Sequence, residues 1–314
     1  MITFNVDVEM IEIIKPASHE DWLAVRAKGL GSSEVGTVLG VNGYDTPYKL
    51  WLRKTGQAPA VPTSVVMQIG HELEDYVARL FSEATGVAVD ESTAGDWCVR
   101  NDSRPYMIAS PDRLCDAPAG RVLLECKTTR AAFSEDDYPR TWYCQVQYLL
   151  TCLEMDTAAL AWLNVTNGAF GYKWIKRDDK FAAFMIERLD AFWDCVKTGR
   201  APAPLTAEDV YAQHPAVAGL EKEADAGVLA ALKELKAKKA EVAAAEEEIA
   251  AYEEQIKLFM RDAEVLTSEG ATVATWRVSK PAARLDTAAL KAAHPDLVKE
   301  FTKKGEPTRR FLLK

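Results

Sequence analysis

The segment Arg121–Thr128 (RVLLECKT) places two charged residues inside an apolar run, and this feature constrains the fold more than any other in the sequence. Its alternation predicts a β-strand, because successive side chains of a strand point to opposite faces of the sheet. One face then carries small and apolar side chains, and the other carries Glu125 beside Lys127. On a solvated face this pair would be a salt bridge that contributes under about 1 kcal/mol. The alternative is that both charges face a functional site.

A second carboxylate, Asp112, precedes that strand at the end of a strand predicted over residues 105–110 (PYMIAS). The segment RLCDAPAG (113–120) is predicted as the turn of an antiparallel hairpin, which would bring Asp112 beside Glu125. Two adjacent carboxylates repel unless they share a proton or a cation, and hard divalent cations prefer oxygen ligands. The hairpin therefore predicts a metal site, with Lys127 within reach of a phosphate oxygen and an attacking water.

Hydrophobic periodicity predicts an α/β domain over the larger part of the chain. Helices are expected over residues 18–28, 67–85, 138–153 and 178–198, and strands over residues 96–100, 105–110, 121–128, 158–165 and 170–176. A helix, several strands, a helix, two strands and a helix, in this order, are typical of a mixed sheet packed by helices. Glu74 lies at the edge of the apolar face of its helix and, taken alone, would be a solvated residue.

The character of the sequence changes after the breaker APAPL (201–205). We expect a domain over residues 1–200, a linker over 201–220 and a C-terminal extension over 221–314. Within the extension, apolar residues recur every seventh position from Val228 to Ile256, which predicts a long helix with a narrow apolar seam. Packing against the same chain and binding a partner are equally consistent with this seam. A strand pair and a basic tail are expected to follow.

The composition indicates a folded protein, since 48% of the residues are apolar and eight are tryptophans. No apolar run approaches the roughly 18 residues of a membrane span, and the N-terminus lacks the layout of a signal peptide, so we expect a cytoplasmic location. The six cysteines occur singly, which favours reduced, buried thiols. A net charge of −9 argues against non-specific coating of nucleic acid, although a local basic groove stays open.

The glycine-rich segment GLGSSEVGTVLG (29–40) predicts a further helix that is capped by Ser32 or Ser33. The N-terminus of a helix after a glycine turn can hold an anion, because its first backbone N–H groups lack partners within the helix. Most such caps bind nothing, so the segment becomes a candidate anion site only in combination with other features.

Four motifs in order resemble those of one nuclease family. S-P-D followed by hydrophobic-E-C-K (110–127) is similar to the PD-(D/E)-x-K nuclease signature. The segments 29–56 (GLGSSEVGTVLGVNGYDTPYKLWLRKTG), 69–75 (IGHELED) and 142–150 (WYCQVQYLL) resemble the YqaJ-like viral recombinases, relatives of the phage lambda exonuclease. The resemblance runs from Trp22 to Leu163, about half of the chain, and implies a restriction-endonuclease-like fold with a mixed central sheet.

The resemblance implies a metal centre. Asp112, Glu125 and the carbonyl of Cys126 would ligate Mg²⁺, for which Mn²⁺ could substitute. Glu74 would be an outer or second-metal carboxylate. Lys127 would orient or deprotonate the attacking water and steady the charge that develops on the scissile phosphate.

The resemblance also implies a pocket for the 5′ phosphate of a DNA end. Its residues would be Arg26, Ser33, Ser110 and Gln145, with Ser32 as a competitor for the role of Ser33. Gln147, on the same helix as Gln145, would as readily be structural. Met67 would lie where an apolar wedge splays the duplex, and the alternative is a methionine of the core.

The implied function is a Mg²⁺-dependent 5′-to-3′ exonuclease that acts on linear double-stranded DNA and leaves 3′ overhangs for single-strand annealing. Such an enzyme would be encoded by a phage or prophage, act in the bacterial cytoplasm, form a ring of three subunits and work with an annealing protein. The alternatives are an endonuclease of the same superfamily and a non-catalytic scaffold that binds DNA ends.

Overall fold

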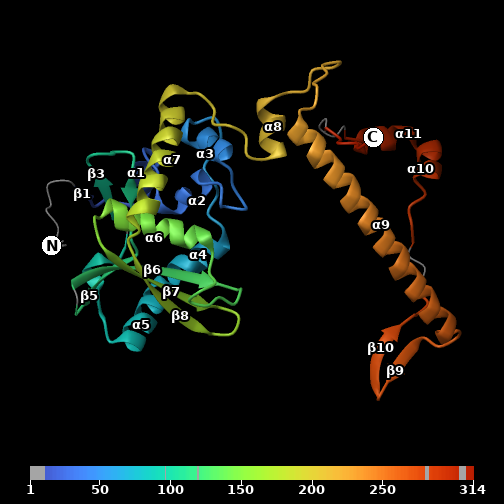
Figure 1. Cartoon of the computed structure of the whole chain (residues 1–314), viewed down its shortest axis with the longest axis horizontal. Coiled ribbons are helices and arrows are strands. Elements are labelled where there is room, and N and C mark those ends of the chain that lie inside the picture. Colours follow the sequence, from blue (N-terminus) through green and yellow to red (C-terminus); the bar gives the residue numbers. More distant parts are fainter. Residues whose placement is uncertain (1–10, 96, 119, 280–282, 304–308) are drawn as a thin grey trace. The chain divides into compact units, whose positions relative to one another are not determined.

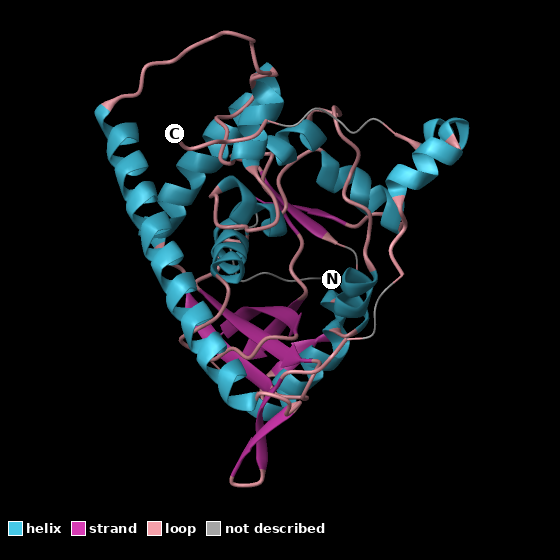
Figure 2. Ribbon diagram, turned by 90° about the vertical axis from the view of Figure 1, so that its right-hand side faces the viewer, coloured by secondary structure: helices cyan, strands magenta, loops and turns pink. Residues whose placement is uncertain are grey.

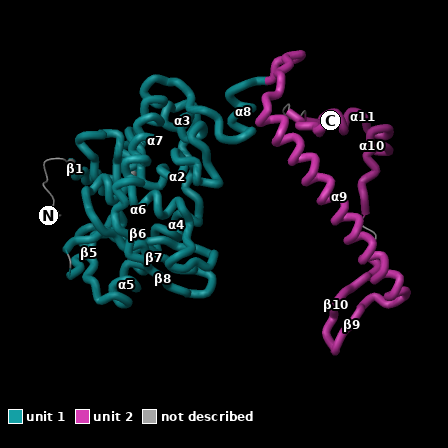
Figure 3. Tube along the Cα trace, viewed as in Figure 1, with its two compact units in different colours: residues 1–215 teal, residues 216–314 magenta. Residues whose placement is uncertain are grey.

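The chain forms two compact units, residues 1–215 and residues 216–314 (Figure 3). The computed structural model describes residues 11–95, 97–118, 120–279, 283–303 and 309–314. Among these residues, no helix is both long and apolar enough to cross a membrane.

The first unit is built around a five-stranded sheet with the strand order β2–β5–β6–β7–β8 (Figure 1). The strands are β2 (Ala88–Asp90), β5 (Arg113–Ala117), β6 (Gly120–Thr129), β7 (Thr157–Asn164) and β8 (Phe170–Lys176). β6 and β7 run parallel, and the other neighbouring strands are antiparallel. The predicted mixed sheet is therefore confirmed. A smaller sheet contains β1 (Ile11–Ile14), β3 (Cys98–Asn101) and β4 (Ile108–Ala109).

Helices cover both faces of the large sheet, which gives the predicted α/β class (Figure 2). The helices of this unit are α1 (His19–Ala27), α2 (Val35–Val38), α3 (Pro47–Lys54), α4 (Val65–Glu72), α5 (Glu74–Thr85), α6 (Arg140–Cys152), α7 (Asp179–Thr198) and α8 (Ala207–Gln213). The alternation of β6 explains the two layers. Leu123 packs in the core that contains α6 and α7, whereas Val122, Leu124 and Cys126 pack in the core that contains α5.

The predicted hairpin around Asp112 is wrong in its details. The segment 113–117 is strand β5 and not a turn, while the preceding segment contributes β4 to the smaller sheet. Leu114 and Cys115 are both fully buried and belong to cores on opposite faces, so this short strand lacks the alternating pattern that would reveal it. Arg113 pairs with Leu124, and Asp112 therefore lies opposite Glu125.

Two predicted helices also differ from the structure. The helix expected over residues 67–85 is divided at Leu73 into α4 and α5, so that Glu74 is the first residue of α5. At the glycine-rich segment, Gly31 and neither serine is the N-cap of a 3-10 helix, Ser32–Glu34, that leads into α2. The Glu34 carboxylate accepts a hydrogen bond from the Gly31 N–H, 2.8 Å away. The serine side chains therefore remain available for other contacts.

The second unit contains a 35-residue helix, α9 (Ala226–Met260), as its heptad pattern predicts. A hairpin of β9 (Val265–Ser268) and β10 (Ala271–Thr275) follows, and then α10 (Thr287–Ala293) and α11 (Pro295–Phe301). The side chain of Asp225 caps α9 by accepting a hydrogen bond from the Val228 N–H.

Candidate active site

A cavity of about 190 Å³ in the first unit collects almost all of the predicted site residues. Its lining includes Arg26, Ser32, Ser33, Glu74, Ser110, Asp112, Glu125, Lys127 and Gln145. These residues come from α1, the 3-10 helix, α5, the segment between β4 and β5, β6 and α6. The fold thus joins segments that are more than a hundred residues apart in sequence into one polar site.

The register of β5 and β6 creates the acidic part of the site. Asp112 Oδ2 accepts a hydrogen bond from the backbone N–H of Cys126, 2.7 Å away. Glu125 is fully buried, and its Oε1 accepts from Lys127 Nζ and Gln145 Nε2. Its Oε2 is also buried and has no hydrogen-bond partner among the described residues. An unsatisfied polar atom in a protein interior is costly, so this oxygen is a candidate ligand for a bound ion.

Burial and mutual repulsion raise the pKa values of these carboxyl groups. Burial, with the nearby Asp112, raises the pKa of Glu125 to about 8, although Lys127 opposes the shift. The same two causes raise the pKa of Glu74 to about 7, against the effect of His71. Burial also raises the pKa of Asp112. Without a cation the cluster therefore retains protons at neutral pH, and a bound divalent cation would replace them.

Lys127 is held as a cation inside this cluster. Burial lowers the pKa of its amine, but Glu125 and Asp112 outweigh that effect and raise the pKa above its ordinary value. The ammonium group is therefore protonated and available to stabilise negative charge in the cavity.

The donor set fits a magnesium ion that keeps water and substrate ligands. Carboxylate oxygens of Asp112, just before β5, and of Glu125 in β6 line this cavity, and Glu125 Oε2 lacks a partner within the described part of the chain. No group of three or more His, Cys, Asp or Glu side chains in the described part of the chain forms a ready-made metal cluster. Mg²⁺ is typically bound by one or two carboxylates, with waters and substrate phosphates completing its shell. The Cys126 side chain packs in the core on the α5 side, so only the Cys126 backbone is available to this site.

Arg26, which also lines the cavity, is held by contacts with Trp22 and Ser33 and by the close approach of Gly31. Its guanidinium lies 4.5 Å from the centroid of the Trp22 ring, and its Nη2 donates to Ser33 Oγ over 3.1 Å. A Cβ added at Gly31 would lie 2.7 Å from Arg26 Nη2. The guanidinium is thus presented in one orientation, which favours binding of a phosphate.

Two further polar groups accompany Arg26. Gln145 Nε2 lies 3.3 Å from Ser32 Oγ, which links the 3-10 helix to Glu125 through a single amide group. Ser110 Oγ is buried and unpartnered within the part of the chain that the structure describes. Together with Arg26, these donors form a candidate anion pocket next to the carboxylates.

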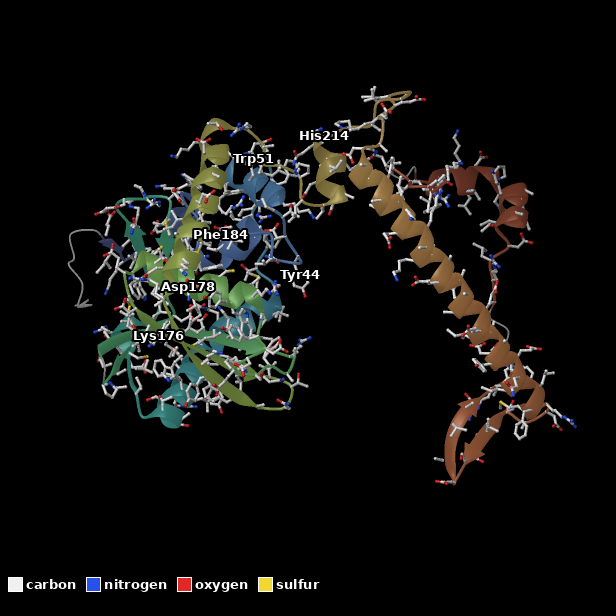
Figure 4. All side chains as sticks on the ribbon, viewed as in Figure 1. Tyr44, Trp51, Lys176, Asp178, Phe184 and His214 are labelled. Atoms are coloured by element: carbon white, nitrogen blue, oxygen red, sulfur yellow. The ribbon has the colours of Figure 1, made fainter. Side chains whose placement is uncertain are left out.

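The structure separates two other candidates from the cavity. Gln147 is fully buried and bridges the end of β8 to the start of α7: it donates to the Lys176 carbonyl and accepts from the Asp178 N–H. Figure 4 labels Lys176 and Asp178. These hydrogen bonds give Gln147 a structural role, which is one of the two roles considered for it from the sequence. Met67 lies on α4 with 54% of its surface exposed, so the interpretation as a core methionine is wrong.

Sequence reasoning missed the residues that position the predicted ones. Trp22 and Gly31 hold Arg26, and His71 Nδ1 lies 3.2 Å from Glu74 Oε1. The spacing of Trp22 and Arg26 by one helical turn was an available signal, because side chains four residues apart meet on a helix.

A second cavity of about 600 Å³ adjoins the first and shares Ser33, Lys127 and Gln145 with it. Tyr44, on the loop between α2 and α3, lines this cavity and is 99% exposed (Figure 4). Asn42 fixes the loop, because its side chain donates to Thr37 Oγ1 and accepts from the Tyr44 N–H. An aromatic ring on a fixed loop beside a candidate anion pocket is a suitable surface for a nucleobase.

Known proteins resemble the chain in sequence and in fold. The sequence model of the YqaJ-like viral recombinase domain matches residues 21–156. The uncharacterized protein YqaJ of Bacillus subtilis (strain 168) is 33% identical over 312 residues, which cover 95% of this chain and 94% of that protein.

Among solved structures, the chain is similar to an alkaline exonuclease (LHK-Exo) from Laribacter hongkongensis, with 18% identity, a TM-score of 0.47, and coverage of 58% of this chain and 94% of that chain. Another is a phage related exonuclease from Haemophilus somnus 129PT, with 14% identity, a TM-score of 0.43, and coverage of 54% and 94%. The 33% identity to YqaJ extends over both units, well beyond the matched domain. The chain therefore belongs to the YqaJ-like viral recombinase family.

Proposed function

We propose that the protein is a divalent-metal-dependent exonuclease that degrades the 5′-ended strand of linear duplex DNA and leaves a 3′ overhang for recombination by single-strand annealing. One observation carries the proposal: the paired carboxylates and Lys127 share a single cavity with an anion pocket built around Arg26. A cutting site next to a pocket for one terminal phosphate favours an exonuclease over an endonuclease. The buried, partly unpartnered carboxylates favour an enzyme over a scaffold, since paired acids repel DNA unless a cation is bound.

The metal ligands are assigned to Asp112 and Glu125, with the Cys126 carbonyl as a third protein oxygen and Glu74 as an outer carboxylate. The unpartnered Oε2 of Glu125 supports its role in this set. When bound, Mg²⁺ would polarise the scissile phosphate and lower the pKa of a coordinated water. Gln145 donates to the other oxygen of Glu125 and so keeps the carboxylate oriented.

Lys127 orients the attacking water and stabilises the charge that develops on the phosphate. Its ion pair with Glu125 holds the ammonium group at the cavity wall, where substrate oxygens would lie. Since the amine is protonated, it acts as an electrostatic group and hydrogen-bond donor in this arrangement.

Arg26, Ser33 and Ser110 receive the 5′ phosphate of the shortened strand. The fixed guanidinium supplies charge and paired donors, and the Ser110 hydroxyl gains a partner on binding. Nucleotides beyond the terminal one would enter the adjoining cavity, where Tyr44 offers a stacking surface. Met67 and the neighbouring exposed residues of α4 would contact the splayed duplex end.

The test compares end-labelled linear duplex with covalently closed circular duplex, each with Mg²⁺ and with EDTA. We expect degradation of the linear substrate only, dependent on metal and lost in Lys127→Ala. Lys49→Ala is the matched control, because Lys49 pairs with Glu208 and does not line the cavity. Cleavage of the closed circle would contradict an exonuclease, and DNA binding without any product would favour the scaffold.

The family resemblance adds expectations about partners and setting. These are a ring of three subunits, an annealing protein and a bacterial cytoplasm that contains phage or prophage DNA. The mass in solution tests the ring: it should correspond to three chains or to a multiple of three.

A further inference from the structure

The helix α9 exposes a long apolar stripe. Its exposed residues include Ile249 at 57%, Tyr252 at 66% and Phe259 at 75%. In proteins, a helix such as this 35-residue one is stabilised mostly by packing of its apolar face and less by the hydrogen bonds along its own backbone. Large exposed apolar stripes usually mark an interaction surface.

The stripe has the spacing of a coiled-coil seam. One row consists of Val228, Leu235, Val242, Ile249 and Ile256, which are seven residues apart. A companion row lies three residues further on and consists of Ala231, Lys238, Ala245, Tyr252 and Phe259. Two rows at positions a and d of a heptad allow the side chains of one helix to fit between those of a second helix.

Charge divides the same helix into two unlike halves. The part from Lys233 to Glu241 carries four lysines and two glutamates, whereas the part from Glu246 to Lys257 carries five glutamates and one lysine. Two copies side by side in parallel would place acidic halves together. Two antiparallel copies place the basic half of each against the acidic half of the other, which is electrostatically favourable.

An antiparallel pair also aligns the apolar rows. With the two helices almost fully overlapped, Val228 lies opposite Phe259 of the second copy, and Leu235 lies opposite its Tyr252. Near the middle, Val242 lies opposite Ala245 of the second copy, so a larger side chain meets a small one.

The same register accommodates Lys238, the polar residue that interrupts the companion row. It lies opposite Ile249 of the second copy, beside the glutamates of the acidic half. Its aliphatic stem can cover the isoleucine while its ammonium group reaches a carboxylate.

We propose that α9 is a self-association helix that pairs antiparallel with α9 of a second copy of this chain. The seam and both charged halves lie in the second unit, and the candidate active site lies in the first. The proposal therefore stands apart from the proposed nuclease function.

Cysteine cross-linking tests both the partner and the orientation. The single variants Val228→Cys and Phe259→Cys are prepared separately in a Cys195→Ser background, because the other five native cysteines are buried. Positions 228 and 259 lie about 46 Å apart along one helix and so cannot form a bond within it. Under mild oxidation we expect a disulfide-linked dimer when the two variants are mixed and none from either variant alone. Dimers from each variant alone would show a parallel pair, and no dimer in any sample would show that another surface covers the stripe; both outcomes overturn the proposal.

A second measurement guards against distortion by the cysteines. Val242→Glu combined with Ile249→Glu places charge in the seam, whereas Ala243→Glu combined with Ala250→Glu adds the same charge on the outward face. We expect the seam variant to sediment with a smaller mass than the wild type, because the α9 pairs dissociate, and the control to keep the wild-type mass. Equal masses for all three proteins would contradict the proposal. The rate on linear duplex, measured in parallel, reports the nuclease function separately.

Discussion

The two units of this molecule depart from ordinary burial in opposite ways. In the first unit, charged side chains such as Glu125 are buried, and one carboxylate oxygen lacks a partner among the described residues. In the second unit, apolar side chains such as Phe259 are exposed along a helix. Polar groups are normally paired when buried, and large apolar surfaces are normally covered. We therefore propose a missing partner for each unit: a cation and a phosphate for the first, and a protein surface for the second.

The largest effect is expected when the charge of Glu125 is removed, which tests whether the buried carboxylate of the first unit binds a cation. We expect Glu125→Gln to reduce nuclease activity by about 10³-fold or more, because the charge-stabilising arrangement of the site is lost. The measurement is the initial rate on linear duplex with saturating Mg²⁺. Glu83→Gln is a suitable control, since Glu83 is exposed and pairs only loosely with Arg79. An active Glu125→Gln enzyme would remove this residue from the metal site.

The same substitution should have the opposite effect on stability without metal. The pKa of Glu125 is about 8 in the folded protein, against an ordinary value of 4.5. The folded form therefore binds more protons between these values, and the stability of the metal-free protein should fall as the pH rises from about 4.5 to 8. Thermal unfolding in EDTA checks this: Glu125→Gln should unfold at a higher temperature than the wild type at pH 9, and the gap should narrow at pH 5. A wild-type melting temperature that rises from pH 5 to pH 9 would contradict the expectation.

A smaller loss of activity is expected when the proposed pocket for the terminal phosphate is disturbed. Trp22→Ala should lower the rate on 5′-phosphorylated ends by about tenfold, because Arg26 loses the ring that fixes it. The rate on unphosphorylated ends should change little. Trp22→Phe keeps an aromatic face and serves as the matched control. The same loss on both kinds of end would indicate a general structural defect.

The smallest effect is expected at the exposed edge of the adjoining cavity. Tyr44→Ala should weaken binding of a DNA end by about 1 kcal/mol, or roughly fivefold, because one stacking surface is removed. Tyr44→Phe should bind like the wild type, and a fluorescent DNA end in titration measures both. Since the side chain is 99% exposed, the melting temperature should stay constant.

Strand alternation was sufficient to predict the acidic face of the site. It placed Glu125 and Lys127 on one side of β6, where the structure joins them in an ion pair. Asp112 was placed by a predicted hairpin that used residues 105–110 as its first strand instead of β5. The sequence did not reveal β5, because this strand is buried on both faces and its side chains do not alternate between apolar and polar. Asp112 nevertheless lies opposite Glu125, since the register through Arg113 and Leu124 leads to this arrangement.

The local sequence pattern could not predict contacts between segments that are distant in the sequence. The link from Gln145 to Ser32 depends on how α6 packs beside the 3-10 helix, and nothing near either residue encodes it. The heptad pattern predicted α9 and its apolar seam. Such a seam does not show whether it packs against its own chain or binds a partner. The division of charge along the helix supplies the additional constraint.

Gly31 has a consequence for how substrate preference could change during evolution. A methyl group at this position would meet the far end of the Arg26 side chain, which can swing away without disturbing the backbone. Gly31→Ala should therefore fold normally and still cut DNA, while losing its selectivity for phosphorylated ends. A single conservative substitution that leaves the carboxylates unchanged would be enough to turn a discriminating enzyme into a permissive one.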